Sequence, residues 1–219
     1  MRAVLQRVKA ASVEVNGRII SRIGPGIVAL IGISTEDTAA EISPLVTRVL
    51  GAKLWNEGLT AQAILRGEAD KLIVANGHGG RVVASILEDA NGKLEDPVKQ
   101  NPADDTQDTA LAQNGAHKSG GEELWGGKPW KTNVVALGGE VLCVSQFTLH
   151  ARMNKGTKPD FHRAMGGQSA RELYEQFLAS MREAYKCDCI KDGQFGAMMD
   201  VSFVNDGPVT IILDTFDKK

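Results

Sequence analysis

Two short segments combine polar side chains with residues that control the course of the backbone. Residues 145–149 read Ser-Gln-Phe-Thr-Leu and place amide and hydroxyl groups inside an otherwise apolar run. Residues 205–210 read Asn-Asp-Gly-Pro-Val-Thr and put a Gly-Pro pair between two β-rich runs. Neither segment sets a nucleophile beside a base, as covalent catalysis would need. Together they indicate a pocket with backbone walls and an enzyme that works mostly through main-chain groups.

The apolar run around the first segment predicts a strand over residues 141–149. In a strand, Gln146, Thr148 and His150 share one face, and the first two can meet a ligand if that face borders a cleft. A half-solvated strand is the alternative. His150 lies about 6.5 Å along the strand from Thr148, so we do not expect it to activate the hydroxyl. The sequence has no Gly-x-Ser-x-Gly elbow, and covalent catalysis is therefore not favoured.

Four stretches of the chain resemble the D-aminoacyl-tRNA deacylases. They are MRAVLQRV at residues 1–8, SQFTLHA at 145–151, GQFGAMM at 193–199 and NDGPVT at 205–210. The likeness runs over about residues 1–58 and 128–215, which makes it more specific than a single motif. The resemblance implies the fold of that family, a curled β-sheet layered with helices, working as a homodimer.

The resemblance also implies a reaction, the hydrolysis of the ester bond of D-aminoacyl-tRNA to tRNA and a D-amino acid, as chiral proofreading in translation. The achiral glycyl ester should be accepted too. The backbone amides of Ser145, Gln146, Phe147 and Thr148 are expected to hold the ester carbonyl oxygen, a contribution of about 3–4 kcal/mol per donor. The ribose 2′-hydroxyl would assist attack by water, leaving Thr148 as a pocket residue. No metal or organic cofactor is implied.

The Gly207-Pro208 pair, considered alone, predicts an ordinary trans proline in a turn, because only about 5% of such bonds are cis. The resemblance instead implies a cis pair that enters the active site of the partner subunit. Its carbonyls would face the α-carbon of the aminoacyl group and exclude an L side chain, and a Cβ on Gly207 would fill the substrate's space. The resemblance implies that Arg7 braces this loop through its carbonyls, the alternative being a solvated charge at a strand edge.

Further residues are assigned to the pocket by the resemblance. Phe195 and Met199 are predicted on one strand with an even spacing, so that they share a face. Core packing is one explanation of that face, and the resemblance places it near the terminal adenosine. Ala164 fits a small-residue position at the pocket rim.

A basic loop follows the first segment. Residues 155–161 resemble the Lys-Gly-x-x-Pro-x-Phe loop of the family. Lys155 and Lys158 can contact phosphates of the acceptor end, although ordinary surface lysines explain them equally well.

The length of 219 residues and the 42% apolar content allow one large domain with a real core. We predict a single domain over residues 1–219, interrupted by an insertion at about 59–127. The insertion holds eleven acidic and six basic residues, a net charge of −5, and the rest holds sixteen and nineteen, a net of +3. The total of −2 gives no general nucleic-acid signal, and the mildly basic remainder suits a few phosphates.

Cysteine content and hydropathy suggest a reducing, cytoplasmic setting. Three cysteines do not make a disulfide framework, and no Cys/His cluster has the spacing of a metal site. No apolar run reaches the ~18 residues of a membrane span. Charged residues interrupt any signal-peptide core near the N-terminus.

The periodicity predicts a mixed α/β or α+β fold. In the first part of the chain we expect a hairpin at Asn16-Gly17, a central strand over 27–33, and a helix from about 35 to 50 that Pro44 kinks or restarts. Further strands are expected from 53, over 72–75 and over 81–87. The last part should hold a helix over 168–185 capped by Ser169 and Glu172, and strands over 195–204 and 209–213 around a turn at 206–208.

Two other functions remain open from the sequence. The chain can be a binding module that holds the charged tRNA end without cleaving it. It can also be an esterase of small esters that uses Ser145 or Thr148, in which case alanine at that position abolishes activity.

Overall fold

The computed structural model describes residues 1–66, 129–154 and 156–217. The strands predicted over 72–75 and 81–87, and Lys155, lie outside the described residues. In chain order, the strands and helices are β1 (Arg2–Val15), β2 (Arg18–Ile23), β3 (Gly26–Gly32), η1 (Ala39–Glu41), α1 (Ile42–Gly51), β4 (Lys53–Asn56), α2 (Ala61–Leu65), β5 (Trp130–Asn133), α5 (Val134–Leu137), β6 (Glu140–Ser145), η2 (Phe147–His150), α6 (Gly167–Ala184), η3 (Cys187–Cys189), β7 (Ile190–Asp192) and β8 (Asp200–Asp214), where η marks a 3₁₀ helix.

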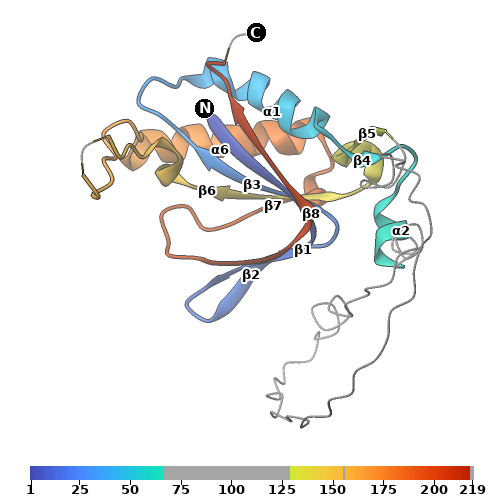
Figure 1. The fold of residues 1–219 in the computed structure, drawn as a ribbon. Helices are drawn as coiled ribbons and strands as arrows, with labels where there is room; N and C mark the ends of the chain where they lie inside the picture. Colours follow the sequence, from blue (N-terminus) through green and yellow to red (C-terminus); the bar gives the residue numbers. More distant parts are fainter. Residues whose placement is uncertain (67–128, 155, 218–219) are drawn as a thin grey trace, which may run out of the picture. The chain divides into compact units, whose positions relative to one another are not determined.

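The long strand β1 is the centre of a curled sheet (Figure 1). Its first half pairs antiparallel with β3 and its second half with β2, while β8 runs along its other side for most of its length. β6 and β7 continue the sheet beyond β3 in parallel. β4 and β5 form a separate two-stranded sheet. The mixed architecture of a curled sheet with helices confirms the predicted fold class.

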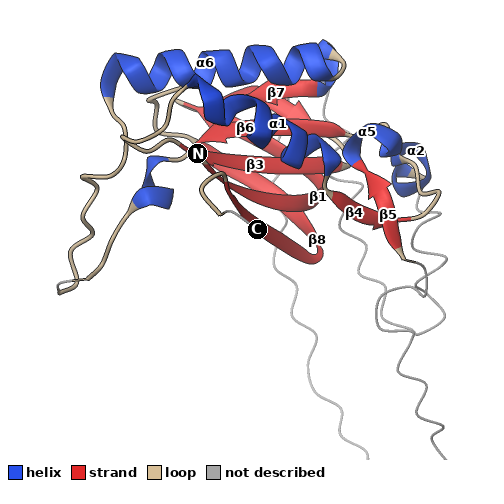
Figure 2. Ribbon diagram, turned by 90° about the horizontal axis from the view of Figure 1, so that it is seen from above, coloured by secondary structure: helices blue, strands red, loops and turns tan. Residues whose placement is uncertain are grey.

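Helices α1 and α6 cover one face of the sheet (Figure 2). The residues of α6 that the core buries lie on one side of the helix and are Ala170, Tyr174, Phe177, Leu178 and Met181. They pack with α1 and with the inward side chains of β1, β3 and β6 in one cluster. The other sheet face has a smaller cluster around Val8, Val13 and Val28. The sheet therefore has two apolar sides, of which the helices cover one.

The long C-terminal helix confirms the prediction within one residue at either end, but its predicted cap is wrong. The N-cap is Gly166, which has no side chain to accept a hydrogen bond. Ser169 falls inside the first turn, because the helix begins at Gly167, two residues before the predicted cap. Gln168 contacts Glu172 through their side chains at 3.1 Å instead.

The helix expected from residue 35 begins further along the chain, at Ile42. The 3₁₀ turn η1 comes first, and Thr38 and Glu41 form a capping box on it. α1 then begins at Ile42, so Pro44 stands in its first turn, where the backbone N–H has no intrahelical partner to lose. Pro44 marks a restart of the helix rather than a kink.

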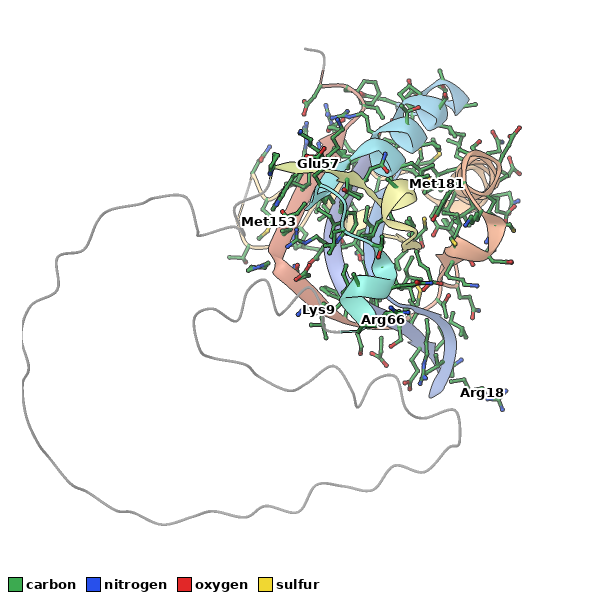
Figure 3. The ribbon with its side chains drawn as sticks, turned by 90° about the vertical axis from the view of Figure 1, so that its right-hand side faces the viewer. Lys9, Arg18, Glu57, Arg66, Met153 and Met181 are labelled. Atoms are coloured by element: carbon green, nitrogen blue, oxygen red, sulfur yellow. The ribbon has the colours of Figure 1, made fainter. Side chains whose placement is uncertain are left out.

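The hairpin between β1 and β2 turns at the predicted Asn-Gly pair. Asn16 and Gly17 have φ of 51° and 73°, the positive values of a type I′ turn. Arg18 lies at the tip of this hairpin and points away from the sheet (Figure 3). The prediction of this turn is confirmed.

The two strands predicted around the turn at residues 206–208 are one strand, β8, and the chain does not reverse direction there. Gln6 pairs with Thr210 and Val8 with Asn205. Residues 206–209 therefore stand opposite Arg7 alone and form a bulge from a strand that continues on the same partner. A turn signal in the sequence cannot tell a reversal from such an outward loop, because both need the same residues.

The cysteines are free. Cys143 is fully buried in β6, and this burial raises the pKa of its thiol to about 12. Cys187 and Cys189 lie in η3. In the part of the chain that the structure describes, no helix has the length and apolar character of a membrane span.

Candidate active site

The Ser-Gln-Phe-Thr segment forms an abrupt end to strand β6. β6 stops at Ser145 and η2 follows, so the strand predicted over residues 141–149 is wrong beyond Ser145. β3 ends at Gly32, and β6 has no pairing partner past that point. The N–H of Gln146 still reaches the carbonyl of Ile31 at 2.7 Å, and the backbone then turns. A helical turn replaces the alternating faces expected here.

η2 packs closely on the end of β3 because Gly32 has no side chain. A Cβ on Gly32 would lie 2.9 Å from the Cβ of Leu149 and 3.2 Å from the carbonyl oxygen of Gln146. Both distances are too short for an ordinary contact, so a larger residue would push η2 outward. The sequence analysis missed Gly32. Its signal was a glycine at the end of an uninterrupted apolar run.

The start of η2 offers main-chain donors to a ligand. The leading N–H groups of a helical turn have no partner within it, and Phe147 and Thr148 occupy these positions. The Phe147 side chain is 55% exposed. The Thr148 hydroxyl accepts a hydrogen bond from the side-chain amide of Gln146. An amide cannot act as a base, so this contact orients the hydroxyl without activating it.

His150 is not a base for Thr148 in this geometry. Its imidazole packs beside Gly32, with Cδ2 about 3.1 Å from the position of a glycine Cβ. Its Nε2 atom is buried and has no hydrogen-bond partner among the described residues. Burial lowers the pKa of His150 below its ordinary value, although a contact with the Gly32 backbone opposes the shift. His150 is therefore neutral at pH 7.

A loop closed by residues 152 and 160, here called the arm, begins and ends beside η2 and carries other predicted residues. Arg152 and Asp160 exchange two backbone hydrogen bonds, at 2.9 and 2.8 Å, and close the arm. Lys158 is exposed on it. Phe161 at its base meets Phe147 edge to face, with ring centroids 5.0 Å apart. The loop thus returns to the Ser-Gln-Phe-Thr segment.

Ala164 follows this arm and is held against the end of β3. It forms a backbone bridge with Ser34, and its N–H donates to the carbonyl of Phe161 at 2.8 Å. Its side chain is half-buried. The position near η2 fits a small residue at a rim.

The Gly207-Pro208 bond is cis. Gly207 has φ of 121°, and a Cβ there would lie 2.7 Å from Cγ2 of Val209 and 3.2 Å from Nη2 of Arg7. Glycine is therefore needed at this position for both its backbone conformation and its lack of a side chain. The side chain of Asn205 accepts a hydrogen bond from the N–H of Val209 at 3.0 Å and closes the loop.

Arg7 holds the loop from the neighbouring strand. Its Nε donates to the carbonyl of Asp206 at 3.2 Å and to the Asp206 carboxylate at 2.9 Å. Its Nη1 donates to the carbonyl of Leu54, and its guanidinium lies 5.1 Å from the ring centre of Trp130. Burial lowers the pKa of Arg7, against the opposing charge of Asp206, but an arginine stays protonated at pH 7. The sequence placed Asp206 in the signature without predicting its ion pair with Arg7, and Trp130 was not predicted at the site.

The chain matches the family model described as D-Tyr-tRNA(Tyr) deacylase over residues 4–77 and 85–214. It belongs to this family. The D-aminoacyl-tRNA deacylase of Yarrowia lipolytica is 37% identical over 220 residues and is covered completely, as is this chain. That of Saccharomyces cerevisiae is 36% identical, with 98% of this chain and 99% of the relative covered. The resemblance seen in the sequence is confirmed.

Two solved structures share the fold. The c-Myc DNA unwinding element binding protein is 34% identical, with a TM-score of 0.64 and 98% of both chains covered. A probable eukaryotic D-amino acid tRNA deacylase is 14% identical, with a TM-score of 0.57 and 97% of both chains covered, and shows likeness of fold alone. The family match and the relatives both extend into residues 59–127.

Phe195 and Met199, assigned to the deacylase pocket, do not lie on a shared strand. They belong to the turn between β7 and β8, where Gly196 has φ of 78° and interrupts extended backbone. Phe195 packs on Tyr174 with ring centroids 5.5 Å apart, on the helix side of the sheet. Met199 packs with the smaller cluster on the other side. The predicted common face is wrong.

The two deacylase signatures lie at different places along β1. Arg2 pairs with Gly32, the residue beneath η2, whereas Arg7 pairs with Ile27 and faces the Gly207-Pro208 loop. Five residues of a strand span about 16 Å. A single chain therefore holds its Ser-Gln-Phe-Thr turn and its Gly-Pro loop apart.

Replacing Gly207 by alanine should destabilise the fold more than the same change at Gly58. Gly58 has φ of 79° and open space around its Cβ position, so Gly58→Ala carries only the backbone cost of about 1–2 kcal/mol. Gly207→Ala adds contacts with Val209 and Arg7, an overpacking cost of about 1–3 kcal/mol. Urea unfolding of both variants measures the difference. Equal losses of unfolding free energy would show that the loop around Gly207 yields freely.

Proposed function

We propose that the protein hydrolyses the ester bond of D-aminoacyl-tRNA and releases tRNA and the D-amino acid, as a chiral proofreading enzyme of translation. The family to which the chain belongs supports this reaction. The observation that carries it in the structure is the start of η2, where main-chain N–H groups are offered without a nucleophile and base beside them. The achiral glycyl ester is a second substrate.

The chemistry at η2 is electrostatic. The ester carbonyl oxygen lies against the amides of the segment formed by Ser145, Gln146, Phe147 and Thr148, which stabilise the negative charge that develops on it. Water attacks with the help of the ribose 2′-hydroxyl of the substrate. Gln146 and Thr148 hold one another and shape the pocket. No protein group forms a covalent bond with the amino acid.

The Gly207-Pro208 loop completes the site from a second copy of the chain. Within one protomer the loop and the turn are anchored about 16 Å apart along β1. A homodimer brings the loop of one subunit to the turn of the other, and the exposed side of β8 offers a surface for it. Ile212, on that strand, is 70% exposed. The loop carbonyls then face the α-carbon and reject an L side chain.

The remaining predicted residues bind the RNA end. Ala164 leaves room at the rim of the pocket. Lys158 and Lys155 contact phosphates weakly through charge. The three free thiols suit the reducing cytoplasm. Residues 59–127, as an insertion in a single domain, carry a net charge of −5 that does not favour phosphate contact.

The discriminating assay compares hydrolysis of D-Tyr-tRNA and L-Tyr-tRNA by the wild-type protein. We expect hydrolysis of the D ester with little of the L ester. Thr148→Ala should keep activity within about tenfold, because the hydroxyl is not the nucleophile. Equal rates on both esters would exclude the chiral loop, loss of all activity in Thr148→Ala would favour the esterase, and tight binding without turnover would favour the binding module.

Removing one backbone donor should be far more damaging than removing a side chain. Phe147→Pro deletes the amide at the first position of η2, where proline is otherwise tolerated, and Phe147→Ala keeps it. Loss of one oxyanion donor lowers kcat by about 100- to 1000-fold. We therefore expect the single-turnover rate constant of Phe147→Pro to be lower than that of Phe147→Ala by about that factor. Similar rates for the two variants would remove this amide from the mechanism.

Mixed dimers test the shared site. Gly207→Ala damages the loop and Phe147→Pro damages the turn, so each homodimer should be inactive. A heterodimer of the two has one site with an intact turn and an intact loop. Random mixing should restore about a quarter of wild-type activity, because half of the dimers then carry one working site of two. No recovery, in a sample shown by mass spectrometry to contain heterodimers, would place loop and turn in the same subunit.

A further inference from the structure

Arg2 joins three parts of the molecule at the far end of β1 from Arg7. Its Nη1 donates to the carbonyl of Leu149 at 2.6 Å. Its Nε and Nη2 donate to one carboxylate oxygen of Asp214 at 3.0 and 2.7 Å. Leu149 belongs to η2 and Asp214 ends β8, so one guanidinium bridges the turn and the last strand.

The bond to Leu149 acts on the turn that carries the proposed amide donors. The N–H of Leu149 is bonded to the carbonyl of Gln146 at 3.3 Å, which closes the turn around Phe147 and Thr148. Arg2 therefore holds the C-terminal side of a turn whose N-terminal side meets the substrate. A cation suits that end, where helical carbonyls point outward.

On this side η2 borders a cavity instead of a packed neighbour. A cavity of about 150 Å³ lies there, lined by Arg2, Ser34, His150, Arg163, Asp214 and Phe216 among others. The buried Nε2 of His150 finds no partner among the described residues. Packing thus constrains η2 where this turn meets Gly32. On the side of the cavity, the hydrogen bond from Arg2 to the carbonyl of Leu149 holds η2 in place.

The carboxylate of Asp214 orients the guanidinium group of Arg2. Asp214 is half-buried, and burial by itself would raise its pKa. The hydrogen bond from Arg2, that from the N–H of Phe216 and the charge of Arg2 outweigh this effect and lower the pKa of Asp214. The carboxylate is therefore ionised throughout the neutral range and holds two of the donors of Arg2, which leaves Nη1 aimed at Leu149.

We propose that Arg2 is a positioning residue for the hydrolysis, which fixes η2 so that the amides of Phe147 and Thr148 stay directed at the ester oxygen. The inference rests on the proposed function. Arg2 touches no substrate. It acts through the carbonyl of Leu149, and its removal lets the turn move into the cavity beside it.

Arg48 provides a matched control. Its Nη1 donates to the main-chain carbonyl of Asp214, also at 2.6 Å, from helix α1. It therefore makes the same kind of bond to the same end of β8 without contacting η2. If Arg2 served only to tie down β8, Arg48→Gln and Arg2→Gln would have similar effects.

The experiment measures single-turnover and steady-state hydrolysis of D-Tyr-tRNA by Arg2→Gln, Arg2→Lys, Asp214→Asn and Arg48→Gln. We expect Arg2→Gln to lower kcat by about 10- to 100-fold, the effect of misplacing a reacting group by an ångström, with little change in KM. Arg2→Lys should recover part of the loss, and Asp214→Asn should lower kcat in the same direction by less. Arg48→Gln should keep the wild-type kcat.

The backbone amide chemical shifts of Phe147 and Thr148, measured by NMR in labelled full-length protein, are a second test that does not depend on enzyme activity. These shifts should change in Arg2→Gln and remain at their wild-type values in Arg48→Gln. Unmoved shifts in a folded Arg2→Gln variant, or equal kcat in Arg2→Gln and Arg48→Gln, would overturn the proposal, and so would an effect on KM alone. If Arg2→Gln does not fold, Asp214→Asn decides by the same criteria. A wild-type protein without hydrolytic activity would refute the proposed function, and the shifts would still test Arg2.

Discussion

Strand β1 determines where both chemically distinctive segments of this protein lie. It pairs with β3 on one side and β8 on the other, so a shift by one residue would break both ladders and turn every side chain of β1 to the other face. Arg2 and Arg7 are five residues apart on it, an odd spacing that sends them to opposite faces. One reaches the Ser-Gln-Phe-Thr turn and the other reaches the Gly-Pro loop. A single register thus sets the positions of both.

The polar side chains around these segments mostly hold backbone. Arg7 binds the carbonyls of Asp206 and Leu54, Arg2 binds that of Leu149, and Gln146 holds Thr148. Such an arrangement suits a reaction in which main-chain groups contact the substrate, because preorganised amides need not move as charge develops. Beside the Ser-Gln-Phe-Thr turn, the described residues accordingly place no base next to the Thr148 hydroxyl. The two glycines at contact points, Gly32 and Gly207, leave room for the backbone to approach.

Local patterns predicted the regular parts of the fold well. The Asn16-Gly17 turn, the central strand β3 and helix α6 follow from turn chemistry and periodicity, which act over a few neighbouring residues. The predictions failed where an element ended for a tertiary reason. β6 stops at Ser145 because its partner β3 ends, and the strand expected from residue 195 begins only at Asp200, after a turn that contains Gly196. Hydropathy alone did not mark either boundary, because apolar residues stand on both sides of Ser145-Gln146 and of Gly196.

The sequence by itself determined the two signatures, the family they belong to and the residue types of the candidate site. It did not determine how these residues meet, because a contact between Arg2 and Leu149 or between Arg7 and Asp206 joins positions far apart in the chain. Only the tertiary structure decided that the Gly-Pro loop is a bulge opposite Arg7 and that the Ser-Gln-Phe-Thr segment is a helical turn on Gly32. The physical reason is strand pairing, which selects one register from many that the local sequence permits equally.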